Sequence, residues 1–224
     1  TADLLKLVNS AAFSLRDPCQ SITKAIQMVG IRGIKNMLYS IGTIQTLGGN
    51  TENVRKLWQH CHQVAFYSYN LARNFYSSDR DIIEDAYICG LLHDIGKVLF
   101  ENKYTESLNK FEAICDAKNI SLDTIERLCC GANHSEIGAL IAEKWNFPKV
   151  IINCLRFHHS PFDSPNQFKK ISCIVYLANM IAQYQSDEIE FYQFDEQVLN
   201  ELKIRTEDHL KVISDKLLHA FNDR

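Results

Sequence analysis

Proline and glycine are scarce in this chain, which has only 4 prolines and 9 glycines among 224 residues. Turn-rich β folds depend on both residue types, so their shortage favours helices. Long apolar runs are also missing. Even Ile174 to Ala182 falls far short of the roughly 20 residues that a membrane-spanning helix needs. No signal peptide is recognisable, and we expect a cytoplasmic protein. Because Thr1 already lies in a helical pattern, we also expect the chain to be part of a longer protein.

An excess of charge of one sign is absent as well, since the net charge is only -3. This balance gives no reason to expect binding to nucleic acid or to an anionic membrane. The 8 cysteines include no Cys-x-x-Cys pair, and the chain is neither short nor rich in loops, which excludes a disulfide scaffold. We expect reduced thiols, mostly in the core. A redox pair at Cys129 and Cys130 is the less favoured alternative.

Helical periodicity runs from Ala2 to Phe221 without a convincing strand pattern, which predicts an all-α, multi-helix fold. We expect an N-terminal helical lobe over residues 1–50, a helical core over 51–185 and peripheral C-terminal helices over 186–224. The predicted helices cover residues 2–13, 22–29, 31–47, 52–76, 81–100, 104–117, 134–145, 148–159, 171–182, 196–203 and 207–221. Their expected N-terminal caps are Ser21, Thr51, Asn133 with Glu136, and Thr206. An apolar stripe of Leu4, Leu5 and Val8 should attach the lobe to the core.

The stretch from Gly90 to Lys97 places His93 and Asp94 side by side in an apolar run. An unpaired charge in a core is costly, so this pair needs a metal ion or a hydrogen-bond network. A buried pair that only joins two helices explains these residues equally well. Further polar residues recur on other apolar helices, namely His60, His134, His158, His159 and Asn179. Imidazole together with carboxylate suits iron, zinc, manganese or nickel.

Helical spacing predicts how these histidines are oriented. His60 borders the inward stripe of its helix, whereas His62 projects about 200° away from it. We therefore expect His60 to converge with His93 and Asp94, and His62 to lie outside the cluster. His134 falls in the first turn of its helix, where the helix dipole disfavours imidazolium, so we expect a neutral ring.

Several motifs resemble the HD superfamily of metal phosphohydrolases. They are Trp58-x-His60, the block Gly90-Leu91-Leu92-His93-Asp94-Ile95-Gly96-Lys97, His134 and the pair His158-His159. The N-terminal run from Leu4 to Phe13, followed by Ser21-Ile22, Ala25-Ile26 and Gly30, is similar to the HDOD domain, the HD-related output domain of bacterial signalling proteins. The resemblance covers roughly Leu4 to Ala182. It implies an all-helical fold and a regulatory role, often with a degenerate metal site.

Two departures from the superfamily pattern bear on activity. The last metal ligand of the superfamily is an aspartate on a late helix, and the matching position here is Asn179, a neutral and weaker ligand. Related cyclic-dinucleotide phosphodiesterases carry a Gly-Tyr-Pro motif after the histidine pair, where this chain has Ser160-Pro161-Phe162. The first departure weakens the case for turnover, and the second argues against cyclic-dinucleotide phosphodiesterase activity.

We therefore expect a bacterial signal-transduction output domain that binds a protein partner or a small ligand. The alternative is a metal-dependent phosphohydrolase acting on a nucleotide or another phosphoester. In either case a divalent metal such as iron, manganese or zinc would be held by His60, His93, Asp94 and Asn179. The candidates that would face phosphate are Lys97, His134, His158 and His159. A structural histidine network without metal is a third interpretation.

Overall fold

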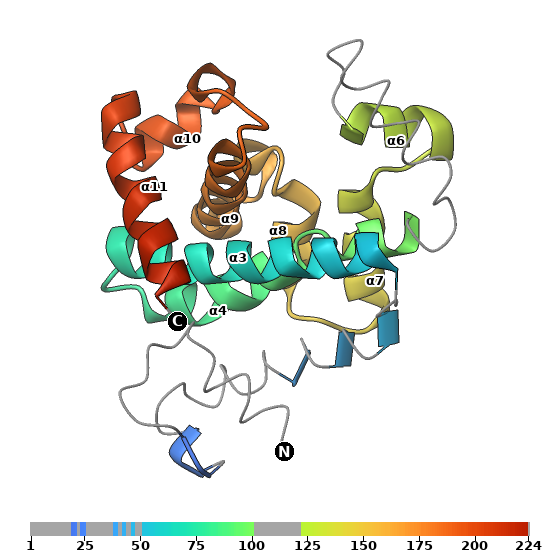
Figure 1. Ribbon diagram of the computed structural model, residues 1–224. Helices are drawn as coiled ribbons and strands as arrows, with labels where there is room; N and C mark the ends of the chain where they lie inside the picture. The colour runs from blue at the N-terminus through green and yellow to red at the C-terminus, as the bar shows by residue number, and fades with distance from the viewer. Residues whose placement is uncertain are drawn as a thin grey trace.

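The computed structural model describes residues 51–100 and 122–223, together with short pieces at 19–21, 23–25, 38–39, 42–43 and 46–47. Every regular element within these residues is helical, so the all-α prediction is confirmed for the part of the chain that can be described (Figure 1). The Leu4, Leu5 and Val8 stripe, the helix expected at 104–117 and most of the expected N-terminal lobe lie outside these residues.

The helices of the described region follow one another without any strand. They are α3 (Glu52–Phe75), α4 (Arg80–Leu92), α6 (Leu122–Cys130), α7 (His134–Lys144), α8 (Lys149–Phe157), α9 (Asn166–Gln185), α10 (Glu196–Glu201) and α11 (Glu207–Asn222), with short 3-10 turns at Pro161–Asp163 and Phe191–Gln193. Residues 95–100 form a further helical stretch. Helix α3 packs along α4, and both contact α9.

The helices begin where the sequence places capping side chains. Thr51 accepts a hydrogen bond from the backbone of α3, and Thr206 does the same for α11. Asn133 and Glu136 form a reciprocal capping box at the start of α7, and Ser21 accepts from the backbone N–H of Lys24 at 3.2 Å. These caps satisfy N–H groups that have no partner within the helix, so the four predicted caps are confirmed. The helix predicted over residues 171–182 begins earlier, at Asn166, and α6 was not predicted.

The helix predicted over residues 81–100 is wrong at its centre. Helix α4 ends at Leu92, His93 and Asp94 form a turn, and helical structure resumes at residue 95. The backbone N–H of Lys97 donates to the carbonyl of Asp94 at 2.9 Å, which is tighter than α-helical pairing. Consecutive side chains on a continuous helix would diverge by about 100°. The turn instead lets His93 and Asp94 face the same site.

Close packing between α3 and α4 depends on Gly90. A Cβ at this position would lie 2.7 Å from the Ser68 hydroxyl and 2.8 Å from the Cα of Ala65. Only glycine therefore permits this approach of the two helices. This contact brings the end of α4, where His93 lies, next to His60 of α3.

The C-terminal helices share the core with α3 and α9. Val198 and Leu210 are fully buried, and they belong to the same apolar cluster as the residues of α3. At the end of α9, the Gln185 amide donates to the Ser214 hydroxyl at 2.8 Å and accepts from the Tyr67 hydroxyl at 2.6 Å. Helix α11 is thereby tied to both α9 and α3. The division into three regions stays a prediction.

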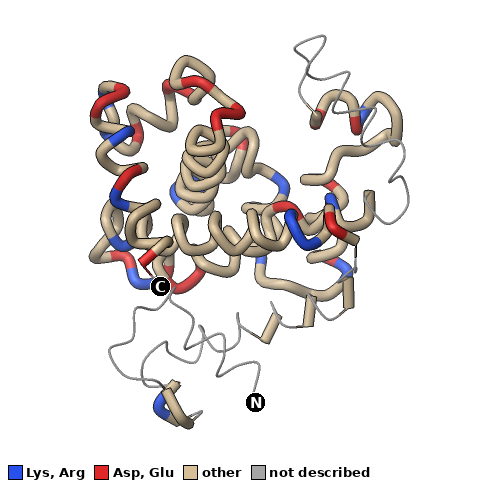
Figure 2. The backbone as a smooth tube through the Cα atoms, viewed as in Figure 1, with Lys and Arg blue, Asp and Glu red and all other residues tan. Residues whose placement is uncertain are grey.

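Charged residues of both signs are interspersed over the helices (Figure 2). Acidic residues gather around the connection from α9 to α10, where Asp187, Glu188, Glu190, Asp195 and Glu196 lie. Cys61, Cys154 and Cys173 are buried among apolar residues, as expected of core thiols. None of the helices in the described part of the chain combines the length and the apolar character needed to cross a membrane.

Candidate metal centre

A cluster of polar side chains surrounds the fully buried carboxylate of Asp94. Its Oδ2 lies 2.7 Å from Lys97 Nζ, 3.2 Å from His93 Nε2 and 3.9 Å from His60 Nε2. The rings of His60 and His93 are 5.4 Å apart at their centroids, whereas His62 is exposed. The predicted convergence of His60, His93 and Asp94 is confirmed, and their role as metal ligands stays a prediction.

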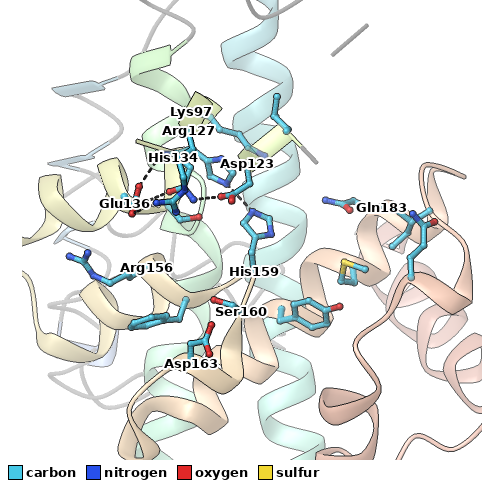
Figure 3. Close-up of a pocket in the computed structure, with 18 of the residues that line it drawn as sticks. Lys97, Asp123, Arg127, His134, Glu136, Arg156, His159, Ser160, Asp163 and Gln183 are labelled. Carbon is cyan, nitrogen blue, oxygen red and sulfur yellow. Dashed lines mark hydrogen bonds and ion pairs between the residues drawn. The ribbon is translucent and has the colours of Figure 1, made fainter. Parts of the chain in front are cut away.

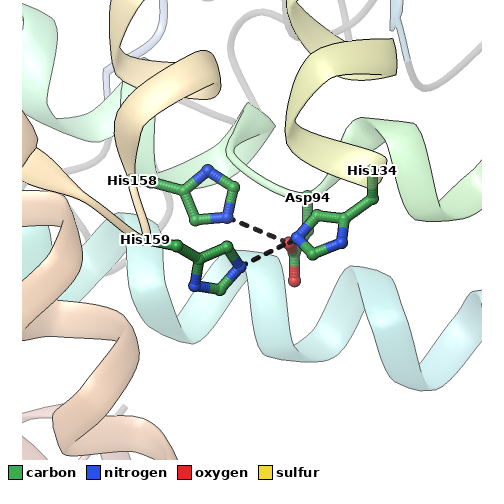
Figure 4. Close-up of side chains that lie close together, drawn as sticks. All are labelled: Asp94, His134, His158 and His159. Carbon is green, nitrogen blue, oxygen red and sulfur yellow. Dashed lines mark hydrogen bonds and ion pairs between the residues drawn. The ribbon is translucent and has the colours of Figure 1, made fainter. Parts of the chain in front are cut away.

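Histidines from α7 and from the end of α8 approach the other carboxylate oxygen (Figure 4). Asp94 Oδ1 lies 3.3 Å from His134 Nε2 and 3.5 Å from His158 Nε2. His159 joins them through a 2.9 Å contact between its Nε2 and that of His134. One potential ligand atom from each of these four residues lies within 4.8 Å of the others. The residues expected to face phosphate therefore lie within the same cluster as the expected metal ligands.

Backbone carbonyls determine the tautomers of two of these histidines. His93 Nδ1 lies 2.8 Å from the Gly90 carbonyl, and His158 Nδ1 lies 2.7 Å from the Leu155 carbonyl. A carbonyl only accepts, so each Nδ1 donates, and in the neutral form of the ring the lone pair of Nε2 points to Asp94. This arrangement is possible because both histidines follow the last turn of a helix, where carbonyls three residues earlier are available.

Three acceptor atoms around Asp94 lack donors. His93 Nε2, His158 Nε2 and Asp94 Oδ1 are buried and make no hydrogen bond within the described residues. Buried acceptors without donors are unfavourable, and acceptors that face one another repel. A divalent cation beside Asp94 would satisfy such acceptors, because neutral imidazole and carboxylate are the ligands that iron, manganese and zinc accept. The side chains present therefore fit a metal ion.

The protonation states of His158, His60 and Asp94 also suit the binding of a cation. Burial lowers the pKa of His158 to about 4, and burial together with the neighbouring His93 lowers the pKa of His60 to about 4. Burial alone would raise the pKa of Asp94, but His93 and Lys97 hold it well below its usual range. Metal ligands have to be deprotonated, and these three groups are so at neutral pH.

The pKa of His134 is shifted in the direction opposite to the one that the helix dipole predicts. Burial and Lys97 disfavour its charge, but the carboxylates of Asp94 and Glu126 outweigh both and raise the pKa of His134. The expectation considered only the helix dipole of α7. Two carboxylates from other parts of the chain decide the outcome, and helical periodicity does not reveal them.

Asn179 lies beside His60. This location agrees with its place in the family pattern, where Asn179 occupies the position of the last metal-binding aspartate. It is buried in α9, and its side chain is a hydrogen-bond partner of the His60 ring. Its Oδ1 also accepts from the Gln183 amide at 3.4 Å. The amide thus contacts a member of the cluster, and its service as a fourth ligand stays a prediction.

Sequence reasoning missed two carboxylates on α6. Glu126 is fully buried and contacts His134 Nδ1 at 2.6 Å, and Asp123 accepts a hydrogen bond from the Asn133 side chain. One signal was present, since Glu126 follows Leu122 by four residues and shares the apolar face of that helix. Asp123, Glu126 and His134 form another group of potential metal ligands.

An open cleft of about 1380 Å³ borders the cluster (Figure 3). Lys97, His134 and His159 line it, together with the apolar side chains of Tyr176 and Met180. Two arginines also reach the cleft, but Arg127 is paired with Glu136 at 2.8 Å and Arg156 with Glu143 at 2.9 Å. The cleft therefore connects Lys97 and His159 directly to solvent.

An all-helical core with a His-Asp turn surrounded by histidines of neighbouring helices defines an HD-type domain. Comparison with known families assigns it more closely. The sequence model of the HDOD domain matches residues 1–161, and the chain belongs to this family.

Individual relatives agree with this assignment. An uncharacterized protein of Treponema pallidum is 35% identical over 98% of the chain, which spans 42% of that protein. A structure from Shewanella amazonensis, whose name proposes a phosphohydrolase, has a TM-score of 0.71 at 22% identity and covers 97% of this chain and 77% of its own. A structure from Marinobacter aquaeolei, whose name proposes a signal transduction protein, has a TM-score of 0.72 at 16% identity. The match covers 99% of this chain and 50% of the Marinobacter chain. At these identities the two structures show the shared fold alone.

Proposed function

We propose that this HDOD domain is an output module of a bacterial signalling protein and that its site binds one divalent cation without efficient turnover. His60, His93 and Asp94 would hold the ion, with His134 and His158 close enough to complete its coordination. A bound cation would supply positive charge for an anionic group of a small ligand or protein partner that enters the cleft.

The observation that carries the cation proposal is the set of buried acceptors around Asp94. His93 Nε2 and His158 Nε2 face the two oxygens of the Asp94 carboxylate, and neither these nitrogens nor Asp94 Oδ1 has a hydrogen bond within the described residues. A purely structural histidine network would place donors opposite acceptors. Here both Nδ1 donors point away from the centre, toward backbone carbonyls. A positive ion is the simplest group that matches this arrangement.

Limited negative charge argues against a two-metal hydrolase. Two cations about 3.5–4 Å apart repel each other and need several carboxylates between them. Among the described residues next to His60, His93 and His158, Asp94 is the carboxylate and Asn179 is a neutral amide. Glu126 lies on the far side of His134, with its Oε2 already accepting two hydrogen bonds.

The second candidate is a metal-dependent phosphohydrolase with a single ion. The cleft favours it, because Lys97 and His159 both line the cleft and can reach a phosphate there. One open coordination position is sufficient for hydrolysis at a metal. The phosphohydrolase proposed in the name of the Shewanella structure points the same way.

Metal binding and turnover are tested on the same samples. Chelated wild-type protein, His93→Ala and His62→Ala are titrated with Mn²⁺, Fe²⁺ and Zn²⁺, and bound metal is measured. We expect one ion in wild type and in the exposed control His62→Ala, and a loss of binding in His93→Ala that keeps its helical circular dichroism. Hydrolysis of nucleotides and cyclic dinucleotides should be negligible. Robust wild-type hydrolysis that disappears in His93→Ala would establish the phosphohydrolase instead, and absence of bound metal in wild type would contradict both.

A further inference from the structure

Glu126 contacts His134 in two places. Its Oε2 accepts from the backbone N–H of His134 at 2.8 Å and lies 2.6 Å from the ring Nδ1 of the same residue. The other ring nitrogen, Nε2, faces Asp94 Oδ1 at 3.3 Å. Glu126 is fully buried, in α6, and is separated from the Asp94 carboxylate by the imidazole.

We propose that Glu126 is a positioning residue of the metal centre, which orients the His134 ring and directs the lone pair of Nε2 toward the cation. The inference rests on the proposed cation site and adds to it the residue that prepares His134. A carboxylate that accepts Nδ1–H excludes the tautomer that would place hydrogen on Nε2.

The position of His134 in its helix explains why a side chain is needed. His93 and His158 each follow a helix end, where a carbonyl three residues earlier accepts Nδ1–H. His134 is the first residue of α7, and a helix start presents free N–H groups where a helix end presents carbonyls. An acceptor for its Nδ1 has to come from elsewhere, and Glu126 of α6 supplies it.

Helix capping alone does not account for Glu126, although its Oε2 accepts the first N–H of α7. The start of α7 already has a reciprocal cap, in which Asn133 Oδ1 accepts from the Glu136 N–H at 2.9 Å and Glu136 Oε2 accepts from the Asn133 N–H at 3.2 Å. Burying a further carboxylate is costly and is tolerated where it makes specific hydrogen bonds. The contact to the ring is what distinguishes Glu126 from Glu136.

A cation held directly by Asp123, Glu126 and His134 Nδ1 is the competing arrangement. Such a cation would occupy His134 Nδ1 and the Glu126 carboxylate, which form a hydrogen bond in the positioning role. The two arrangements therefore exclude each other. Hydrogen bonds favour the positioning role, because Glu126 Oε2 already accepts the His134 N–H and Asp123 accepts from the Asn133 side chain.

The test compares Glu126→Leu and Glu126→Gln with Glu136→Leu and Glu136→Gln as matched controls. Long-range ¹H–¹⁵N spectra of the metal-free protein at alkaline pH, where imidazoles are neutral, report the tautomer of His134. The signal of this ring is identified by its absence in His134→Gln. Titration with Mn²⁺ then gives the metal affinity of each variant.

We expect Glu126→Leu to lose the Nδ1–H tautomer and to bind Mn²⁺ about 10–100-fold more weakly. Glu126→Gln should retain the tautomer and most of the affinity, since its amide oxygen still accepts, and the Glu136 variants should change neither. If Glu126→Leu fails to fold, Glu126→Asp, which withdraws the carboxylate by one methylene, should show the same two losses in weaker form.

Three results would overturn the inference: an unchanged tautomer in Glu126→Leu, an equal loss of affinity in Glu136→Leu, or spectra of the metal-loaded protein that place the ion on Nδ1. Failure of the proposed cation site is distinguishable from all three. Wild type would then bind no Mn²⁺, while the tautomer spectra, which need no metal, would still decide whether Glu126 sets the ring of His134.

Discussion

Gly96 lies directly against the backbone carbonyl of His134, so that a Cβ on Gly96 would overlap the carbonyl oxygen. This contact joins the turn that carries Asp94 to the first residue of α7. The same Cβ would lie 3.0 Å from the backbone nitrogen of Gly138, one turn further along that helix. Backbone packing therefore sets the distance between Asp94 and His134.

Gly96→Ala should destabilise the protein by roughly 1–3 kcal/mol, the usual cost of overpacking a tight contact. The atoms it meets are backbone atoms, which cannot rotate away. Urea denaturation measures the change. Gly138→Ala is the matched control, because its Cβ would meet ordinary contacts at 3.4 Å. Equal midpoints for Gly96→Ala and wild type would show that the two backbones separate easily.

Asn179→Asp should strengthen binding of Mn²⁺ on the order of tenfold, since a carboxylate replaces a neutral amide of the same length beside His60. Calorimetric titration of the chelated protein measures the affinity. Gln183→Glu adds the same charge one turn along α9 and serves as the control. Equal gains in both variants would mean that general electrostatic attraction, and not coordination at position 179, is responsible.

The stability of the metal-free protein should depend on His158 below neutral pH. The folded protein keeps this ring neutral down to its pKa of about 4, whereas the unfolded chain takes up the proton near the usual value of 6.5. Between these pH values the unfolded state binds more protons, so the free energy of unfolding decreases as the pH falls. We expect His158 to contribute roughly 3 kcal/mol to this decrease.

Urea denaturation at about pH 7 and at about pH 4, with chelator present, provides the measurement. His158→Gln should lose less stability than wild type on acidification, because glutamine has no proton to bind. The raised pKa of His134 acts in the opposite direction and is present in both proteins. Parallel decreases in the two proteins would show that His158 is readily protonated in the folded state.

Gln185→Ala should destabilise the protein by about 1–3 kcal/mol, because it leaves polar groups of Tyr67 and Ser214 without their shared partner in a partly buried position. Thermal and urea denaturation would both report the loss. Gln167→Ala, at an exposed position on the same helix, should have little effect. A Gln185 variant as stable as wild type would mean that the other contacts of α11, such as that between Tyr184 and Glu207, are sufficient to hold it.

The local elements were predictable because they depend on neighbours in the chain. The starts of α3, α7 and α11 follow from Thr51, the Asn133–Glu136 box and Thr206, each of which satisfies backbone N–H groups within three residues. The position of His60 on the inward face of α3 follows from the 3.6-residue period in the same way. The burial expected of apolar residues outside the described parts, such as Leu5, remains a prediction.

By itself, the sequence determined the all-helical class, the starts of the capped helices and the set of histidines that meet at Asp94, since capping and periodicity act over a single turn. Tertiary structure alone decided three further points. It broke the helix at His93 and Asp94, brought Glu126 of α6 to the ring of His134, and raised the pKa of that ring. The last two result from contact between segments separated in the chain, where packing and electrostatics depend on distance in space and not on spacing in sequence.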